Sequence, residues 1–218
     1  MAPARVLYLH GFASSARSTK AGSFEQRFAS LHVPFRCPDF NEPDFRSLTM
    51  TRMLRQLEAE LVAPGRSTAP ATLIGSSLGG TLAILAAARF PDRVDRVVLL
   101  APAVMFARPG HHVLPPERIE EWRRTGVLGF FHYAYGEERP LDYAFYEDSL
   151  RYDAVDAVFA QPTMVFQGMR DASVDYRSVE RFAQERANVR LSLLDDDHQL
   201  TASLPRIWDG IEGFLDLA

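Results

Sequence analysis

The sequence predicts an α/β fold: a predominantly parallel six-stranded sheet with helices on both faces. Three observations support this prediction. Short aliphatic or β-branched runs alternate with segments whose apolar residues recur at helical spacing. The 218 residues fit one large domain, which can bury about 70% of the surface that the unfolded chain exposes. With 47% hydrophobic residues, the composition is that of an ordinary globular protein and not of a disordered one.

Each element is predicted from its own pattern, in chain order. Buried strands are expected where apolar runs are bounded by glycine, proline or polar residues, at 6–9, 33–36, 71–74, 97–100, 163–166 and 189–194. Helices are expected where apolar residues recur at i, i+3, i+4 and i+7, around 24–31, 50–61, 82–87, 179–183 and 204–214. Because parallel strands need crossover connections, this alternation predicts right-handed βαβ units.

One segment interrupts the alternation, because about 60 residues separate the fourth predicted strand from the fifth. Pro115-Pro116 predicts the start of a helix there. Five of the seven tyrosines also lie in this segment. Within a single domain, 1–218, we therefore expect a helical lid at about 104–160 that covers a pocket. The pocket residues predicted from this insert are Trp122, Phe130, Phe131 and Tyr133. The alternative is a satellite core that only adds stability.

Charge and cysteine content limit the classes of partner. A net charge of -4 argues against a nucleic-acid partner, because phosphate binding needs clustered cations. Cys37 is the only cysteine, which excludes a disulfide framework and a Cys-rich metal site, and we expect neither metal nor cofactor. No apolar run approaches the roughly 18 residues of a membrane span and no signal-peptide pattern is present, so we expect a cytoplasmic protein without a membrane partner.

A predicted strand-to-helix turn carries the motif Gly75-Ser76-Ser77-Leu78-Gly79. This is the context of a G-x-S-x-G nucleophile elbow, in which the sharp turn holds the central hydroxyl clear of the sheet. Glycines on either side avoid a collision with the neighbouring strand or helix. The alternative is a purely structural glycine-rich turn. We predict that Ser77 is a nucleophile, which requires a histidine base held by an acid.

The acid and the base are expected on loops at the carboxyl ends of later strands. Asp171 is the first acid after the fifth predicted strand, and His198 follows the sixth. The order along the chain is therefore Ser, Asp, His. Asp175 is an alternative acid. Alternative bases, which would need closure of the insert, are His111, His112 and His132.

A tetrahedral intermediate also needs two backbone N–H donors. The N–H of Leu78 follows the nucleophile at the positive end of its helix. We assign the second donor to the N–H of Phe12, in the loop after the first strand, where Gly11 allows close approach. His10 is expected to shape this loop and not to take part in catalysis.

On these residues, the chain resembles the α/β-hydrolase superfamily over nearly its whole length. The oxyanion loop, the nucleophile, the acid and the base correspond to Tyr8-Leu9-His10-Gly11-Phe12, the elbow at Ser77, the run 168–171 and His198. The run 10–15, together with Ser18 and Lys20, resembles the small YqiA-like esterases. The sequence departs from related proteins at Asp195–Asp197, directly before His198. This acidic run either favours the imidazolium form of His198 or forms a solvated loop that faces away.

The resemblance implies a serine hydrolase that cleaves small-molecule carboxylic esters through an acyl-enzyme. Ser77, His198 and Asp171 would form the triad, and the oxyanion hole would comprise Phe12 and Leu78. Alternatives are a thioesterase, a peptidase or amidase with the same triad, and a non-catalytic ligand receptor. We expect a monomer or a homodimer. Lys20 is the only lysine. It is either a product of arginine bias or a cation that anchors the oxyanion loop or favours anionic substrates.

Overall fold

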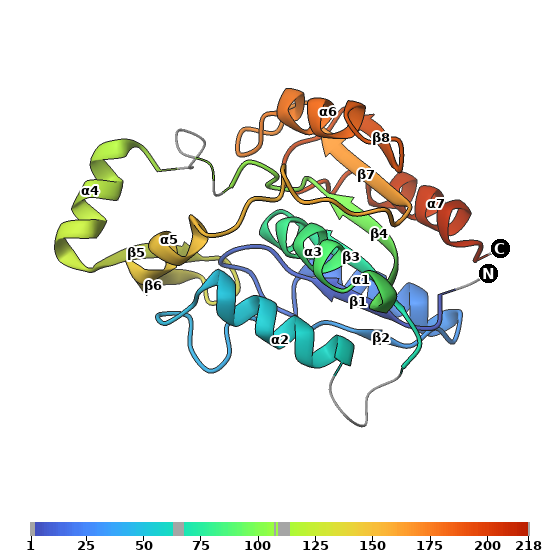
Figure 1. The fold of residues 1–218 in the computed structure, drawn as a ribbon, viewed down its shortest axis with the longest axis horizontal. Coiled ribbons are helices and arrows are strands. Elements are labelled where there is room, and N and C mark those ends of the chain that lie inside the picture. Colours follow the sequence, from blue (N-terminus) through green and yellow to red (C-terminus); the bar gives the residue numbers. More distant parts are fainter. Residues whose placement is uncertain (1–2, 63–67, 107, 109–113, 218) are drawn as a thin grey trace.

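A six-stranded parallel sheet forms the centre of the molecule (Figure 1). The computed structural model describes residues 3–62, 68–106, 108 and 114–217. The strands lie in the order β2-β1-β3-β4-β7-β8, and every neighbouring pair is parallel. Their bounds are β1 (Val6–Leu9), β2 (Phe35–Arg36), β3 (Ala71–Ser76), β4 (Val94–Leu100), β7 (Thr163–Gly168) and β8 (Val189–Leu194). The predicted parallel sheet is therefore confirmed, with all six strands at the expected places.

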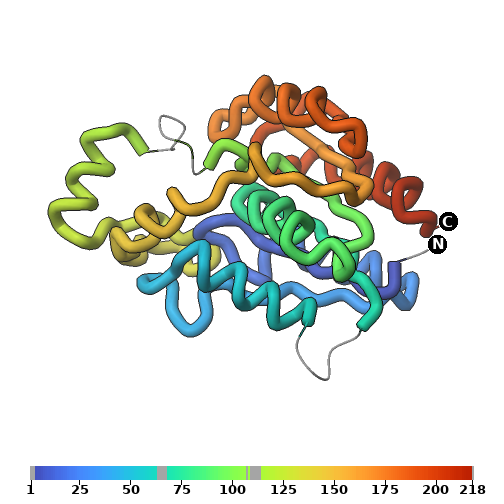
Figure 2. Tube along the Cα trace, viewed as in Figure 1, coloured from blue at the N-terminus to red at the C-terminus, as the bar shows by residue number. Residues whose placement is uncertain are grey.

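Helices cover both faces of the sheet (Figure 2). Two hydrophobic cores lie between these helices and the sheet. One face packs against α1 (Thr19–Ser30) and α7 (Leu204–Leu215). The other packs against α2 (Met50–Val62), α3 (Leu78–Arg89) and α6 (Tyr176–Gln184). A short 3₁₀ helix, η1 (Pro91–Arg93), precedes β4. Because side chains alternate along a strand, Val6 and Tyr8 belong to the first core and Leu7 and Leu9 to the second.

The segment between β4 and β7 contains both helices and strands. It comprises α4 (Pro116–Thr125), β5 (Val127–His132), β6 (Glu137–Asp142) and α5 (Ala144–Ser149). The helix predicted from Pro115-Pro116 is α4. The antiparallel hairpin of β5 and β6 was not expected, because β6 begins with the polar residues Glu137-Glu138-Arg139 and is largely exposed. This insert therefore has a mixed architecture where the sequence predicted a helical one.

Backbone hydrogen bonds attach the insert to the rest of the molecule. The N–H of Tyr133 donates to the carbonyl of Ala13 at 2.9 Å, directly after the loop that follows β1. The N–H of Asp142 donates to the carbonyl of Arg46, also at 2.9 Å, and the Arg46 guanidinium pairs with the Asp142 carboxylate. The hairpin thus has a fixed place beside the carboxyl end of β1. None of the helices in the described ranges is long and apolar enough to cross a bilayer.

Candidate active site

The turn between β3 and α3 holds Ser77 in a strained conformation, with φ 53° and ψ -117°. Its N–H donates to the Leu100 carbonyl at 2.9 Å, which ties the turn to β4. A Cβ at Gly75 would lie 2.3 Å from the Gly79 carbonyl oxygen, and a Cβ at Gly79 would lie 2.0 Å from the Leu9 carbonyl oxygen. Only glycine fits at either position. The turn therefore has the sharpness that a nucleophile elbow requires, and it costs backbone strain of about 1–3 kcal/mol.

Three side chains from separate loops form a continuous hydrogen-bonded chain. Ser77 Oγ lies 3.1 Å from His198 Nε2, and His198 Nδ1 lies 2.8 Å from Asp171 Oδ2. These distances match the nucleophile, base and acid order predicted from the sequence. The carboxylate comes from the loop after β7 and the imidazole from the loop after β8. The structure thus brings together the three residues that the sequence proposed.

The Asp171 carboxylate is fully buried, and it accepts several hydrogen bonds. Burial alone would raise its pKa. The hydrogen bonds from His198, the Val174 N–H and the Gln167 amide outweigh that effect, so the pKa of Asp171 lies below its usual range. The N–H of Ser173 also donates to it. An ionised, fixed carboxylate can orient the imidazole and stabilise its protonated form.

The alternative acid and bases have other roles or lie elsewhere. Asp175 is exposed and caps α6 by accepting the Arg177 N–H at 3.1 Å. His132 is fully buried on β5 and contacts Asn41. The remaining alternatives, His111 and His112, lie outside the described residues.

Two backbone N–H groups beside Ser77 have no hydrogen-bond partner in the part of the chain that the structure describes. They belong to Phe12 and Leu78. A Cβ at Gly11 would lie 3.3 Å from Ser77 Cβ, so the Gly11–Phe12 backbone passes close to the serine. The Phe12 ring is held by Phe45, Phe130 and Phe145 at centroid distances of 5.3 to 5.6 Å. Both donors are therefore available to a developing oxyanion.

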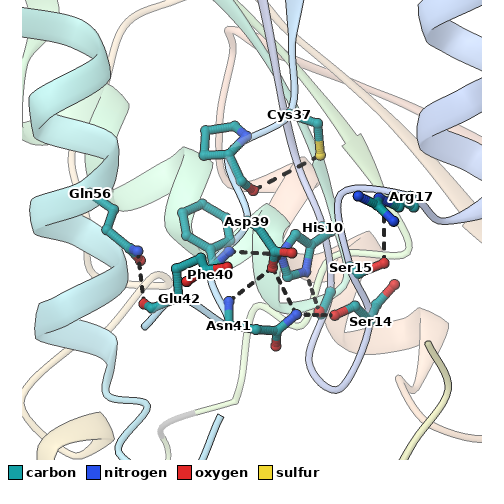
Figure 3. Close-up of polar contacts among 12 residues, drawn as sticks. His10, Ser14, Ser15, Arg17, Cys37, Asp39, Phe40, Asn41, Glu42 and Gln56 are labelled. Carbon is teal, nitrogen blue, oxygen red and sulfur yellow. Dashed lines mark hydrogen bonds and ion pairs between the residues drawn. The ribbon is translucent and has the colours of Figure 1, made fainter. Parts of the chain in front are cut away.

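A network of polar contacts connects the oxyanion loop to the turn after β2 (Figure 3). It was not predicted from the sequence. The Phe40 N–H donates to His10 Nε2 at 2.9 Å, so the proton of the neutral ring lies on Nδ1, which donates to the Gly11 carbonyl at 2.9 Å. The Asn41 amide donates to the Ser14 carbonyl at 2.8 Å. These contacts support the expected shaping role of His10. The only signal in the sequence was the polar turn that closes β2.

The insert contacts this network through its buried histidine. His132 Nε2 lies 3.1 Å from Asn41 Oδ1, and because that oxygen only accepts, the imidazole is the donor. Nδ1 of His132 has no partner among the described residues. Burial, and to a lesser extent His10, lower the pKa of His132. The neutral ring thus joins β5 to the loop that carries Phe12.

A cavity of about 1720 Å³ opens beside Ser77 and His198. The insert contributes Met105, Phe106 and Tyr133 to its lining. Of the four pocket residues predicted from the sequence, Tyr133 is therefore at the cavity and the other three are not among the lining residues. The Trp122 indole N–H donates to the Leu141 carbonyl at 2.8 Å, and its ring packs on Phe130 inside the insert. Phe131 points outward from β5 and is half-exposed.

The acidic run before His198 has two different environments. Asp195 is exposed and pairs with Arg170 at 2.6 Å. Asp196 is buried and accepts the N–H groups of Asp197 and Ser203. Burial raises the pKa of Asp196, but these hydrogen bonds outweigh the burial and lower it overall. The run therefore shapes the histidine loop. Within the described ranges, no group of three or more histidine, cysteine or acidic side chains could hold a metal ion.

Comparison with known proteins gives a family match and a group of similar folds. The model of a family described as "Uncharacterised protein family (UPF0227)" matches residues 5–214. Among curated proteins, the biotin biosynthesis bifunctional protein BioHC of Teredinibacter turnerae is 30% identical over 112 residues. The match covers 47% of this chain but only 18% of that much longer protein.

Solved structures resemble this fold over almost its whole length. Alpha/beta hydrolase domain-containing protein 10 from mouse has a TM-score of 0.79 at 22% identity, covering 97% of this chain and 89% of its own. A putative hydrolase from Agrobacterium vitis S4 has a TM-score of 0.80 at 25% identity, covering 99% and 91%. Est1E from Butyrivibrio proteoclasticus, solved with ferulic acid bound, has a TM-score of 0.79 at 20% identity, covering 97% and 88%.

Proposed function

We propose, from the premise that this chain belongs to the UPF0227 family and has the α/β-hydrolase fold, that it is a serine hydrolase of small-molecule carboxylic esters. The observation that carries the proposal is the hydrogen-bonded chain from Ser77 through His198 to Asp171. It ends at a cavity large enough for a small organic ester. We assign the insert, at about 104–160, as the cap of that cavity.

In the acylation step, Ser77 Oγ attacks the acyl carbon while His198 Nε2 takes the hydroxyl proton. Asp171 stabilises the resulting imidazolium, and the N–H groups of Phe12 and Leu78 donate to the oxyanion. The carbonyl then re-forms, the bond to the alcohol oxygen breaks, and His198 transfers the proton to that oxygen. The products of this step are the free alcohol and an ester on Ser77.

In the deacylation step, water replaces the alcohol. His198 takes a proton from the water, whose oxygen attacks the acyl carbon of the Ser77 ester. The same N–H donors stabilise the second oxyanion. Its collapse breaks the bond to Ser77 Oγ, which recovers the proton from His198, and releases the carboxylic acid. No other group is required for either step.

The test is removal of the hydroxyl of Ser77. Ser77→Ala should reduce kcat on p-nitrophenyl acetate and butyrate by about 10⁴-fold or more, because the oxyanion donors alone give little turnover. It should also abolish covalent labelling by a fluorophosphonate probe. Ser76→Ala, in the preceding residue, is the matched control and should keep both properties. Turnover retained by Ser77→Ala, or a wild-type chain that the probe does not label, would refute the proposal.

The same triad could cleave a thioester or an amide, so the type of bond needs its own measurement. Butyryl esters, thioesters and amides that share one acyl group should be compared by kcat/KM. We expect the ester to be cleaved fastest. A thioester or an amide cleaved faster than the ester would replace the carboxylesterase assignment with a thioesterase or an amidase.

A further inference from the structure

The single lysine of the chain lies at the cavity that opens beside Ser77 and His198. Lys20 is in the first turn of α1, and it lines the same cavity as Ser77 and His198. Its side chain is partly buried. It forms no ion pair within 4 Å with any acidic residue that the structure describes. A cation that faces a cavity without a direct partner is poised to bind an anion.

The acidic groups whose charges act on Lys20 are already engaged with other donors. Asp197 accepts the N–H of Gln199 at 2.8 Å, and Asp196 and Asp171 accept the hydrogen bonds described above. Burial lowers the pKa of Lys20 to about 8, although Asp197, Asp171 and Asp196 act in the opposite direction. The desolvation of the ammonium therefore exceeds the attraction of these three carboxylates. The amine is still charged at pH 7, and a further anion would stabilise it.

A second cation, Arg17, lines the same cavity and also lacks an ion pair among the described residues. It precedes the N-cap of α1 by one residue, and its N–H donates to Ser15 Oγ (Figure 3). Arg108 at the cavity differs, because Asp153 and Asp156 each pair with it at 2.7 Å. Lys20 and Arg17 are thus the cavity cations at the start of α1 that have no ion pair among the described residues, whereas Arg181, which also lines the cavity, lies on α6 on the opposite face of the sheet.

The position of Lys20 indicates which part of a substrate it would contact. The helix that carries Lys20, α1, packs against α7, which follows the His198 loop, on one face of the sheet, so the lysine lies on the imidazole side of Ser77. The alcohol oxygen of an ester must also lie on that side, because His198 Nε2 donates a proton to it. We propose that Lys20, with Arg17, forms a subsite for an anionic group on the alcohol portion of the ester. This inference rests on the proposed hydrolase function.

The experiment uses two pairs of esters that differ only in charge. Butyryl glycolate and butyryl glycolamide place a carboxylate or a neutral amide in the alcohol portion, and monoethyl succinate and ethyl succinamate place them in the acyl portion. We expect Lys20→Met to lower the ratio of kcat/KM for the glycolate to that for the glycolamide by about tenfold or more, the value of a charge-assisted hydrogen bond. The ratio within the succinate pair should stay within about twofold.

Two further variants separate charge from packing. Lys20→Arg keeps the cation and should retain most of the preference for the glycolate. Arg181→Gln removes an exposed cation of α6 that lines the same cavity, and it should change neither ratio. An equal loss on all four esters in Lys20→Met, or a loss confined to the succinate pair, would overturn the subsite. Absence of fluorophosphonate labelling in the wild-type chain would instead refute the hydrolase proposal on which the subsite depends.

Discussion

Asn41 links the insert to the oxyanion loop, because its side chain accepts a hydrogen bond from His132 and donates one to the Ser14 carbonyl. Replacing Asn41 and replacing His132 should therefore have unequal effects. In Asn41→Ala, the His132 imidazole loses its partner inside a fully buried site, and the Ser14 carbonyl loses an amide donor. An unsatisfied buried polar group costs about 1–3 kcal/mol. Because Ser14 is partly exposed and its carbonyl can bind water, the loss in the free energy of unfolding should be close to the cost of the one unsatisfied imidazole, about 1–3 kcal/mol.

His132→Phe should cost less, about 0–2 kcal/mol. This exchange leaves the Asn41 oxygen without a donor, but it also removes the Nδ1 atom of His132 that has no partner at present. A phenyl ring can keep the edge-on contact with Phe45, whose centroid lies 4.8 Å from that of the imidazole. In the double variant, Asn41→Ala with His132→Phe, the loss in the free energy of unfolding should be smaller than the sum of the two single losses by about 1–2 kcal/mol.

The assay is urea unfolding of the four chains, with kcat/KM on p-nitrophenyl butyrate measured alongside. Both single variants should also lower kcat/KM, since the N–H of Phe12 belongs to the loop that Asn41 supports. Asn41→Ala should lower it more. A larger destabilisation by His132→Phe than by Asn41→Ala, or strictly additive losses, would refute this reasoning.

The lowered pKa of His132 adds a pH dependence to this comparison. Burial keeps the folded ring neutral, whereas the unfolded histidine takes up a proton near its usual pKa of about 6.5. The unfolded state therefore binds more protons, and the free energy of unfolding should decrease as pH falls from about 6.5 toward the lower folded pKa. In His132→Phe, the slope over this range should be smaller than in the wild-type chain.

Two further predictions concern the acidic residues around His198. Asp171→Asn should lower kcat by about 10⁴-fold, because the amide does not hold the imidazole in the required tautomer. The assay is turnover of p-nitrophenyl butyrate, and a loss of less than tenfold would contradict the role of Asp171. The pKa of Asp171 is depressed in the folded state, so its ionisation stabilises the fold at pH values above the unfolded pKa of about 3.9. This contribution is lost as pH falls through the folded pKa, and the asparagine variant should lack this pH dependence. Asp196→Asn should cost about 1–3 kcal/mol in urea unfolding, since the buried carboxylate holds the N–H of Ser203, whereas the exposed Asp195→Asn should cost less than about 1 kcal/mol. Equal losses in the two variants would show that Asp195 and Asp196 do not differ in their contribution to stability.

The sheet and the triad geometry could be predicted from the sequence because their determinants are local. A strand buried on both faces is a continuous apolar run, and the carboxyl ends of parallel strands lie on one edge of the sheet. Asp171 and His198 follow two such strands, so their meeting with Ser77 could be expected without any knowledge of side-chain contacts.

The insert was harder to predict, because its aromatic side chains pack mainly on one another. A run of aromatic residues does not indicate which of them face a cavity. The indole N–H of Trp122 donates to the carbonyl of Leu141, which lies nineteen residues further along the chain. Leu141 belongs to β6, a strand whose sequence shows no clear alternation. Long-range polar contacts such as that between Asn41 and His132 have no local pattern at all, since 91 residues separate the partners.

The hydrogen bond between the hairpin and Ala13 fixes the rim of the cavity before a ligand binds. Two facing segments of the chain, one carrying Phe12 and the other carrying Tyr133, are joined by a main-chain hydrogen bond before any ester arrives. The conformational entropy of this rim is therefore lost during folding, and its ordering does not reduce the free energy of ligand binding. For the proposed hydrolase, selection between esters would then depend on fit to a preformed shape, and exchanging the hairpin for that of a relative would alter the rim of the cavity and the position of the Phe12 N–H together.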